Sequence, residues 1–141
     1  MNATIFKFGF PATLVREFEH WLVLARPAQI TVGSLVLATK SDATAYGDLT
    51  PEAFAEQAAV IAAIECGLKA FCGYERINYL MLMMVDPQVH FHVIPRNSGT
   101  RQWGGLEITD LGWPGPPDLK SATDLSPSEI SNLREELATR I

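Results

Sequence analysis

The alternation of residues 88–93 is the feature that most limits how this chain can fold. Apolar side chains occupy the odd positions of this stretch, and glutamine or histidine occupies the even positions. Successive side chains of a β-strand point to opposite faces of a sheet, so the two sets lie on opposite faces. The stretch therefore predicts a strand with an apolar face in the core and a polar face whose side chains lie about 7 Å apart. Pro95 has no N–H to donate and marks the strand end or an unpaired position.

Length and composition predict one domain that spans residues 1–141. The chain has 141 residues, and 48% of them are apolar, which suffices for a single core. The net charge of −5 and the pI near 5.1 argue against binding of a nucleic acid polymer or of an anionic membrane. A small phosphorylated ligand stays open, because backbone amides and histidines hold phosphate without a basic surface.

The N-terminal sequence and the cysteines predict a cytoplasmic protein. Residues 1–21 lack a basic region followed by a long apolar run, so a secretory signal is not expected. No apolar stretch reaches the roughly 18 residues that span a bilayer. Cys66 and Cys72 lie on one expected helix, where their Cβ atoms stay too far apart for a disulfide. Free thiols are typical of a reducing compartment.

The order of the expected elements predicts an α+β fold. Alternating, β-branched segments in the first third predict three or four antiparallel strands. These strands cover residues 4–8, 14–25 and 34–39, with turns at Gly9–Pro11, Pro27 and Gly33. Thr50 as N-cap and Pro51 at the first helical position begin a long helix, which Gly73 ends. Its apolar stripe should lie on the sheet.

The second half of the chain predicts a hairpin, a long loop and a final helix. Residues 76–84 form an apolar strand, and a short turn at Asp86–Pro87 leads into the histidine strand. Because both strands are apolar, we expect the hairpin near the middle of the sheet. Residues 97–125 are rich in Gly, Pro and Trp and predict a long ordered loop. A capping box at Ser126 then begins a helix over residues 126–140.

Three interpretations of His90 and His92 follow from the residues. They are ordinary polar residues on an exposed strand face, or ligands of a metal, or groups for phosphoryl chemistry. A metal site needs at least a third ligand, and neither His20 nor the two cysteines is placed beside them by the sequence. A neutral imidazole can attack phosphorus without prior deprotonation, and a neighbouring imidazole can donate a hydrogen bond to phosphate oxygens.

The stretch "QVHFHVIPR", with the apolar strand before it and "GSLVL" upstream, resembles the histidine triad (HIT) superfamily of nucleotide hydrolases and transferases. The signature of that superfamily is His-x-His-x-His followed by apolar residues. Gln88 stands at the first histidine position, His90 at the middle one and His92 at the last. The resemblance implies that His90 is the nucleophile and that His92 contacts the phosphate. Gln88 would orient His90 or touch the phosphate, or be an exposed strand amide.

The chain is similar to a bacterial HIT subgroup in which an asparagine, a Pro-Gln-x-His-x-His strand and a Trp-Pro-Gly-Pro segment recur. Here these are Asn78, residues 87–92 and residues 113–116. The chain departs from the subgroup at Met83–Met84, where a Gly-Asn pair is usual. The resemblance implies an α+β fold with about five antiparallel strands, one long helix packed on the sheet and a C-terminal helix. It also implies a homodimer.

The resemblance further implies an enzyme without a metal or other cofactor. Its substrate would be a small nucleotide, an anhydride, phosphoramidate or ester of a nucleoside monophosphate, cleaved through a covalent nucleotidyl-histidine. The alternative is a catalytically impaired nucleotide-binding or structural module. Asn78 and Arg96 are candidate substrate-binding residues, although Asn78 equally suits a strand-end hydrogen bond and Arg96 a solvated charge. Trp103 and Trp113 suit packing or dimer contacts.

Overall fold

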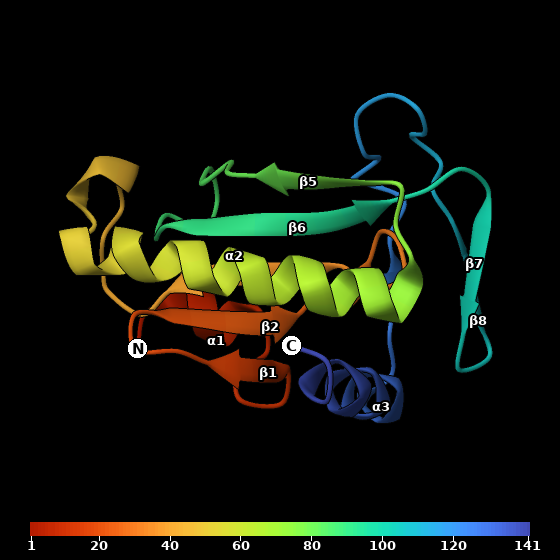
Figure 1. Cartoon of the computed structure of the whole chain (residues 1–141), viewed down its shortest axis with the longest axis horizontal. Helices are drawn as coiled ribbons and strands as arrows, with labels where there is room; N and C mark the ends of the chain where they lie inside the picture. Colours follow the sequence, from red (N-terminus) through yellow and green to blue (C-terminus); the bar gives the residue numbers. More distant parts are fainter.

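The computed structural model describes all 141 residues and confirms an α+β fold built on one five-stranded antiparallel sheet. The sheet order is β1-β2-β4-β6-β5, and α2 crosses one face of the sheet while α1 lies behind the other (Figure 1). These elements are α1 (Ala3–Lys7), β1 (Leu14–Glu17), β2 (Trp21–Ala25), β4 (Leu35–Thr39), α2 (Pro51–Cys72), β5 (Arg76–Leu80) and β6 (His90–Arg96).

The long helix begins and ends where the sequence predicts. The Thr50 side chain accepts a hydrogen bond from the Ala53 N–H at 3.1 Å, and Pro51 fills the first helical position. Gly73 has a φ of 58°, the left-handed conformation that ends helices at glycine. Both cysteines of this helix are free thiols. No helix of the chain is long and apolar enough to cross a membrane.

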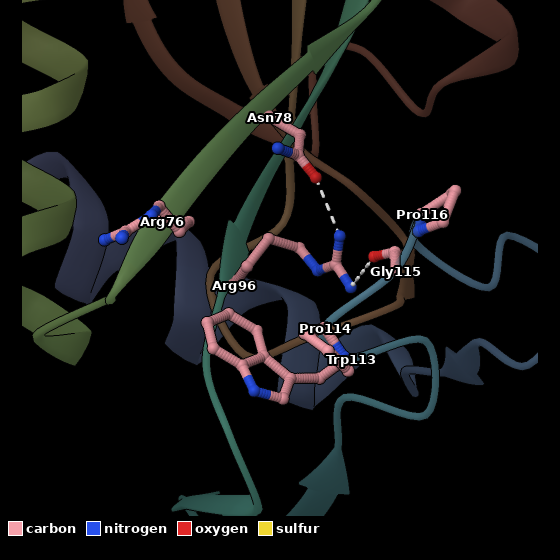
Figure 2. Close-up of a pocket in the computed structure, with 7 residues that line it drawn as sticks. All are labelled: Arg76, Asn78, Arg96, Trp113, Pro114, Gly115 and Pro116. Carbon is pink, nitrogen blue, oxygen red and sulfur yellow. Dashed lines mark hydrogen bonds between the residues drawn. The ribbon is translucent and has the colours of Figure 1, made fainter.

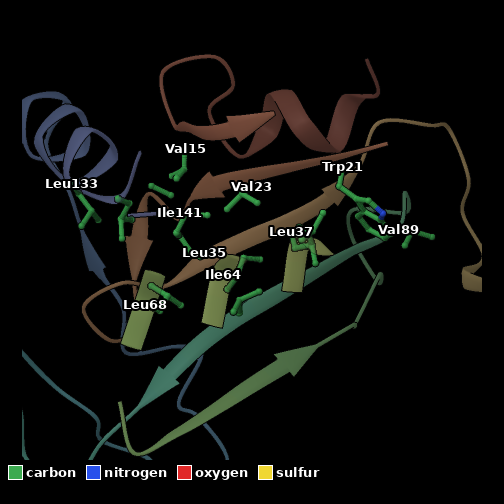
Figure 3. Close-up of a cluster of buried hydrophobic side chains, with 14 of the residues drawn as sticks. Val15, Trp21, Val23, Leu35, Leu37, Ile64, Leu68, Val89, Leu133 and Ile141 are labelled. Carbon is green, nitrogen blue, oxygen red and sulfur yellow. The ribbon is translucent and has the colours of Figure 1, made fainter. Parts of the chain in front are cut away.

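The main core lies between the sheet and its two larger helices, α2 and α3 (Pro127–Ala138) (Figure 3). Trp21 of β2 is fully buried there, and its indole N–H donates to the Ala53 carbonyl of α2 at 2.8 Å. Val89 and Val93 face this core, as their alternation predicts. A second, smaller core on the opposite face joins Ile5 of α1 to side chains of the central strands: Leu22, Leu24, Val36 and Ala38.

The expected strand at residues 4–8 is wrong, because this segment is the helix α1. The Asn2 side chain caps it, accepting from the Ile5 N–H at 3.1 Å and donating to the carbonyls of Thr39 and Ser41. Ile5 is fully buried, whereas Phe6 is 55% exposed. The capped helix covers the sheet face that would otherwise leave the smaller core open.

The expected central hairpin is correct in its pairing and wrong in its position. β5 and β6 pair antiparallel, but β5 is the edge strand of the sheet and ends at Leu80. The connection over residues 81–89 is longer than the expected turn. Met83 adopts a φ of 47°, which breaks the extended conformation, and the side chain of Met84 is 87% exposed.

The segment 97–125 is more regular than the expected loop. It holds a hairpin of β7 (Thr100–Trp103) and β8 (Leu106–Thr109), and β9 (Thr123–Asp124), which pairs with β3 (Ala28–Gln29). Gly104 and Gly105 both have positive φ, as the tight turns of hairpins require. Trp103 packs against Phe71 of α2, with ring centroids 6.2 Å apart. The capping box at Ser126 begins α3 as predicted.

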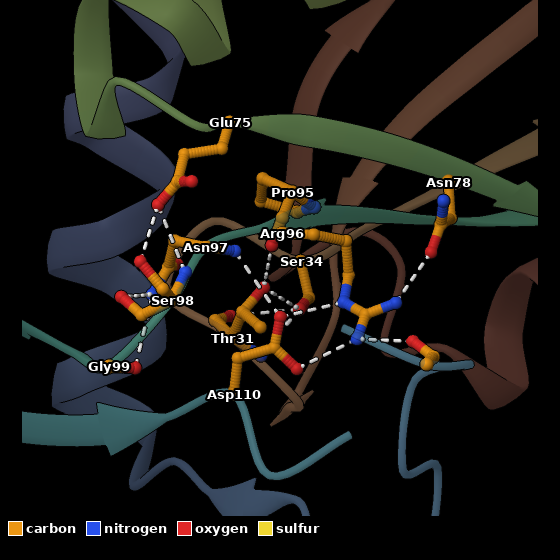
Figure 4. A network of polar contacts seen from close by, with 11 residues as sticks. Thr31, Ser34, Glu75, Asn78, Pro95, Arg96, Asn97, Ser98, Gly99 and Asp110 are labelled. Atoms are coloured by element: carbon orange, nitrogen blue, oxygen red, sulfur yellow. Dashed lines mark hydrogen bonds and ion pairs between the residues drawn. The ribbon is translucent and has the colours of Figure 1, made fainter. Parts of the chain in front are cut away.

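A buried ion pair ties the end of β6 to this segment (Figure 4). Arg96 donates to both carboxylate oxygens of Asp110, at 2.7 Å and 3.0 Å. The same guanidinium donates to the Asn78 side chain at 2.7 Å and to the Gly115 carbonyl at 2.9 Å. The side chains of the pair are 4% and 1% exposed, so removal of one charge leaves the other desolvated.

We expect Asp110→Asn to lower the free energy of unfolding by about 3 kcal/mol, because Arg96 stays buried without its counter-charge. Urea unfolding followed by circular dichroism measures this change. The matched control is Glu136→Gln, which breaks a pair with Arg140 whose side chains are each 39% exposed. Its effect should be no more than about 0.5 kcal/mol. Equal effects of the two variants would show that the buried pair does not stabilise the fold.

Candidate functional site

His90 and His92 lie on the face of β6 that is turned away from α2. In the sheet register they stand opposite Ala38 and Val36, which belong to the smaller core under α1. The Phe8 ring at the end of α1 lies against both imidazoles, with centroids 5.4 Å and 5.7 Å away. The two histidines are only 2% and 8% exposed. The interpretation as ordinary residues on an exposed face is therefore wrong.

Both histidines line a small cavity of about 180 Å³. Its other lining residues are consecutive and come from the connection between β5 and β6: Leu82, Met83, Met84, Val85 and Asp86. Asp86 also forms an ion pair with Lys7 of α1 at 2.7 Å. The cavity thus lies between the strand that carries the histidines and a mostly apolar segment that is anchored to α1.

The His90 ring is held in one orientation by its own strand. Its Nδ1 lies 2.8 Å from the main-chain oxygen of Gln88, and a carbonyl can only accept, so Nδ1 carries the proton. Nε2 is then unprotonated in the neutral ring and has a free lone pair. It has no hydrogen-bond partner, and no buried side-chain nitrogen of the chain lacks one, so Nε2 is open to solvent. This atom can act as a nucleophile.

His92 has the opposite tautomer. Its Nδ1 accepts a hydrogen bond of 3.4 Å from the Nε–H of Arg26, so its proton is on Nε2. Burial lowers the pKa of His92 to about 4, with further contributions from the positive charge of Arg26 and from His90, while Asp86 acts in the other direction. His92 is therefore neutral at pH 7 and offers an N–H donor.

Gln88 contacts His90 through its main chain and not through its side chain. The side-chain oxygen of Gln88 accepts a hydrogen bond of 2.5 Å from the Thr4 hydroxyl of α1. The amide NH₂ group is the part that stays available to a ligand. The main-chain carbonyl of the same residue fixes the His90 ring.

Asn78 and Arg96 lie at the other end of the β5–β6 pair, away from the histidine cavity. They line a second cavity of about 510 Å³ with Arg76 and the segment 113–116 (Figure 2). Arg96 is 3% exposed and is not a solvated charge. Its N–H groups are engaged by Asp110, Asn78 and Gly115. The structure therefore groups Gln88 with the two histidines, and separately groups Asn78 with Arg96.

Four residues of the histidine site are not identifiable from the sequence pattern. Phe8 lies in the segment that was expected to be a strand, and the Lys7–Asp86 pair joins positions far apart in the chain. Arg26 directly follows a strand, where an exposed charge needs no special explanation. The one sequence feature that could point to Arg26 is its position directly after β2. In the sheet β2 lies beside β4, and β4 pairs with the histidine strand β6.

A group of three potential metal ligands lies outside the histidine cavity. It comprises Glu19, His20 and Glu56, whose ligand atoms lie within 4.8 Å of one another. It contains neither cavity histidine, so His90 and His92 lack the third protein ligand that a metal would need.

No protein-family model matches the sequence, and no curated protein matches it. The fold, however, resembles several solved structures. A histidine triad (HIT) protein from Sinorhizobium meliloti 1021 superimposes with a TM-score of 0.77 and 21% identity, covering 100% of this chain and 96% of that one. A histidine triad protein from Bradyrhizobium japonicum gives 0.75 and 19%, with 100% and 96% covered.

A more distant structure has the same architecture. The diadenosine triphosphate hydrolase of Plasmodium falciparum, in complex with cyclomarin A, superimposes with a TM-score of 0.65 and 11% identity, covering 92% of this chain and 76% of that one. The five-stranded sheet, the long helix and the C-terminal helix match this architecture. The chain therefore has the fold of the histidine triad superfamily.

Proposed function

We propose that this protein binds a nucleotide with its α-phosphate at the histidine cavity and cleaves it through a covalent nucleotidyl intermediate on His90. The observation that carries the proposal is the pair of complementary tautomers at one cavity. His90 offers a free Nε2 lone pair, His92 offers an N–H, and their ring centroids are 5.2 Å apart. A nucleophile beside a neutral donor is the arrangement that phosphoryl transfer needs.

In the first step, Nε2 of His90 forms a bond to the α-phosphorus while the bond from phosphorus to the leaving group breaks. The leaving group departs with that electron pair and takes a proton from solvent. His92 donates its Nε2–H to a phosphate oxygen and stabilises the charge there. Water then attacks the phosphorus and loses a proton to solvent, while the bond between phosphorus and Nε2 breaks and its electron pair returns to the ring. The products are the nucleoside monophosphate and neutral His90. Another nucleophile in place of water would give a transferase.

Three further observations support this function. The fold is shared with a diadenosine triphosphate hydrolase. Arg26 donates to Nδ1 of His92 and so keeps the proton of that neutral ring on Nε2. The main-chain carbonyl of residue 88 fixes the orientation of the His90 ring. The substrate class is an anhydride, phosphoramidate or ester of a nucleoside monophosphate.

A binding module without turnover is the second candidate. It is favoured by Gln88, whose side chain cannot exchange a proton as a histidine would and is already bonded to Thr4. For either candidate function, Asn78 and Arg96 could contact a substrate only if it reached the second cavity, which both residues line. The charge of Arg96 is already paired with Asp110.

We also propose a cytoplasmic homodimer. β5 is an edge strand of the sheet, and an unpaired strand edge is a template for association with a second copy. The free thiols of Cys66 and Cys72 are consistent with a reducing compartment. Light scattering should then give twice the 15.5 kDa mass of one chain.

His90→Asn should abolish turnover, because the nucleophilic lone pair is removed. The assay is hydrolysis of adenosine phosphoramidate and of diadenosine triphosphate, combined with acid-quench mass spectrometry of the protein. We expect a nucleotidyl adduct on a peptide containing His90 in the wild type and none in the variant. The control His20→Asn changes a histidine outside the cavity and should retain activity. Nucleotide binding without any adduct on His90 would establish the second candidate instead.

The pKa of His92 predicts a pH dependence of stability. The pKa is about 4 in the folded protein and about 6.5 in the unfolded chain, so between these values the unfolded state binds more protons. The free energy of unfolding should therefore fall as the pH drops from about 6.5 to about 4, by up to about 3 kcal/mol from this residue.

Urea unfolding at pH 7 and at pH 4.5 measures this effect, and His92→Gln should reduce the difference between the two pH values. The control His20→Gln should leave that difference unchanged, because the His20 side chain lies outside the buried site. An unchanged difference in His92→Gln would mean that His92 is not held neutral by the fold.

A further inference from the structure

The segment Leu82–Val85 gives the histidine cavity an apolar wall that the fold itself does not require. Leu82, Met84 and Val85 are 50%, 87% and 80% exposed, so they contribute little to the core. All three nevertheless line the cavity that contains His90 and His92. Large exposed side chains gathered on one segment of a monomer are typical of a surface that binds something apolar.

The charges around the cavity do not favour a chain of several phosphates. Arg26 contacts Nδ1 of His92, which is not the ring nitrogen whose N–H would meet a phosphate oxygen. No lysine or arginine lines the cavity itself, and its one charged lining residue is the Asp86 carboxylate. Lys7, at the rim, is already paired with Asp86. A second phosphate in this cavity would lose its hydration beside alkyl groups and a carboxylate, without a cation to compensate.

The size of the cavity restricts its occupant further. Its volume of about 180 Å³ is below the roughly 300–1,000 Å³ of pockets that enclose a drug-sized ligand. It accommodates one ring or a short alkyl chain and is too small for a whole nucleoside. The group that fits is therefore small, uncharged and apolar.

We propose that Leu82–Val85 is the specificity-determining segment of this site and that it receives the leaving group. The preferred substrate would be a nucleoside monophosphate whose phosphorus carries one apolar organic group, joined as an amide or ester. Dinucleoside polyphosphates are disfavoured. This inference rests on the proposed function and narrows its substrate class. In cleavage of the amide, the P–N bond breaks as the bond to His90 forms, and the amine leaves with a proton taken from solvent.

The test compares kcat/KM for three compounds: the N-benzyl phosphoramidate of adenosine monophosphate, unsubstituted adenosine phosphoramidate and diadenosine triphosphate. The benzyl compound should be preferred over each of the other two by about tenfold or more, because its ring is buried against alkyl side chains. Met84→Lys should reduce this preference over diadenosine triphosphate by about tenfold, since it removes apolar contact and adds a cation. Val85→Lys should act in the same direction.

Leu111→Lys is the matched control. It makes the same change at a residue that is 64% exposed and outside the cavity, and it should leave the preference unaltered. Two results would overturn the inference while the proposed function stands: a preference for diadenosine triphosphate in the wild type, or an equal effect of Met84→Lys on all three compounds. Dissociation of a dimer by Met84→Lys, with the preference unchanged, would assign the segment to a second copy of the chain.

Turnover of none of the three compounds, together with no adduct on His90, would overturn the proposed function and this inference with it. Turnover that survives in His90→Asn would reject the mechanism alone. In that case, the order of kcat/KM among the three compounds still shows which leaving group the segment Leu82–Val85 favours.

Discussion

The pairing of β4 with β6 is the constraint on which the site depends. It places His92 opposite Val36 and His90 opposite Ala38, while Val93 faces the main core. Because side chains alternate along a strand, a shift of this register by one residue would move both imidazoles to the face under α2 and the valines to the face under α1. The apolar side chains of β6 therefore specify the position of the histidines. The chemistry of one face is fixed by the packing of the other.

The short helix α1 converts that polar strand face into a buried site. Ile5 anchors the helix in the smaller core, and Phe8 then lies against both imidazoles. Exclusion of water by this cover is the largest cause of the low pKa of His92. The ion pair of Lys7 with Asp86 links the same helix to the segment that forms the opposite wall of the cavity. Residues at the start of the chain thus influence both the protonation state of His92 and the wall of the histidine cavity.

The local sequence predicts a helix or strand correctly where neighbouring residues alone determine its structure. The alternation of the histidine strand, the Thr50 and Gly73 ends of α2 and the Ser126 capping box all follow from neighbouring residues. Residues 4–8 are expected as a strand but lie mostly in a helix, because five residues with mixed polarity fit either element, and only the sheet beneath Ile5 decides between them. Arg96 pairs with Asp110, and His92 accepts a hydrogen bond from Arg26. Tertiary structure brings these residues together, and no local sequence pattern predicts either contact.

The geometry of His90 explains why a glutamine at position 88 is compatible with a fixed ring and a free lone pair on Nε2. The group that holds Nδ1 is the main-chain carbonyl of that residue, which every amino acid supplies. The tautomer of His90 is therefore independent of the side chain at position 88. Thr4 fixes the side-chain carbonyl of Gln88, which leaves its NH₂ group as an uncharged donor at the edge of the site. A glutamine at this position adds no titratable group beside His90 and leaves the Nε2 lone pair of that ring free.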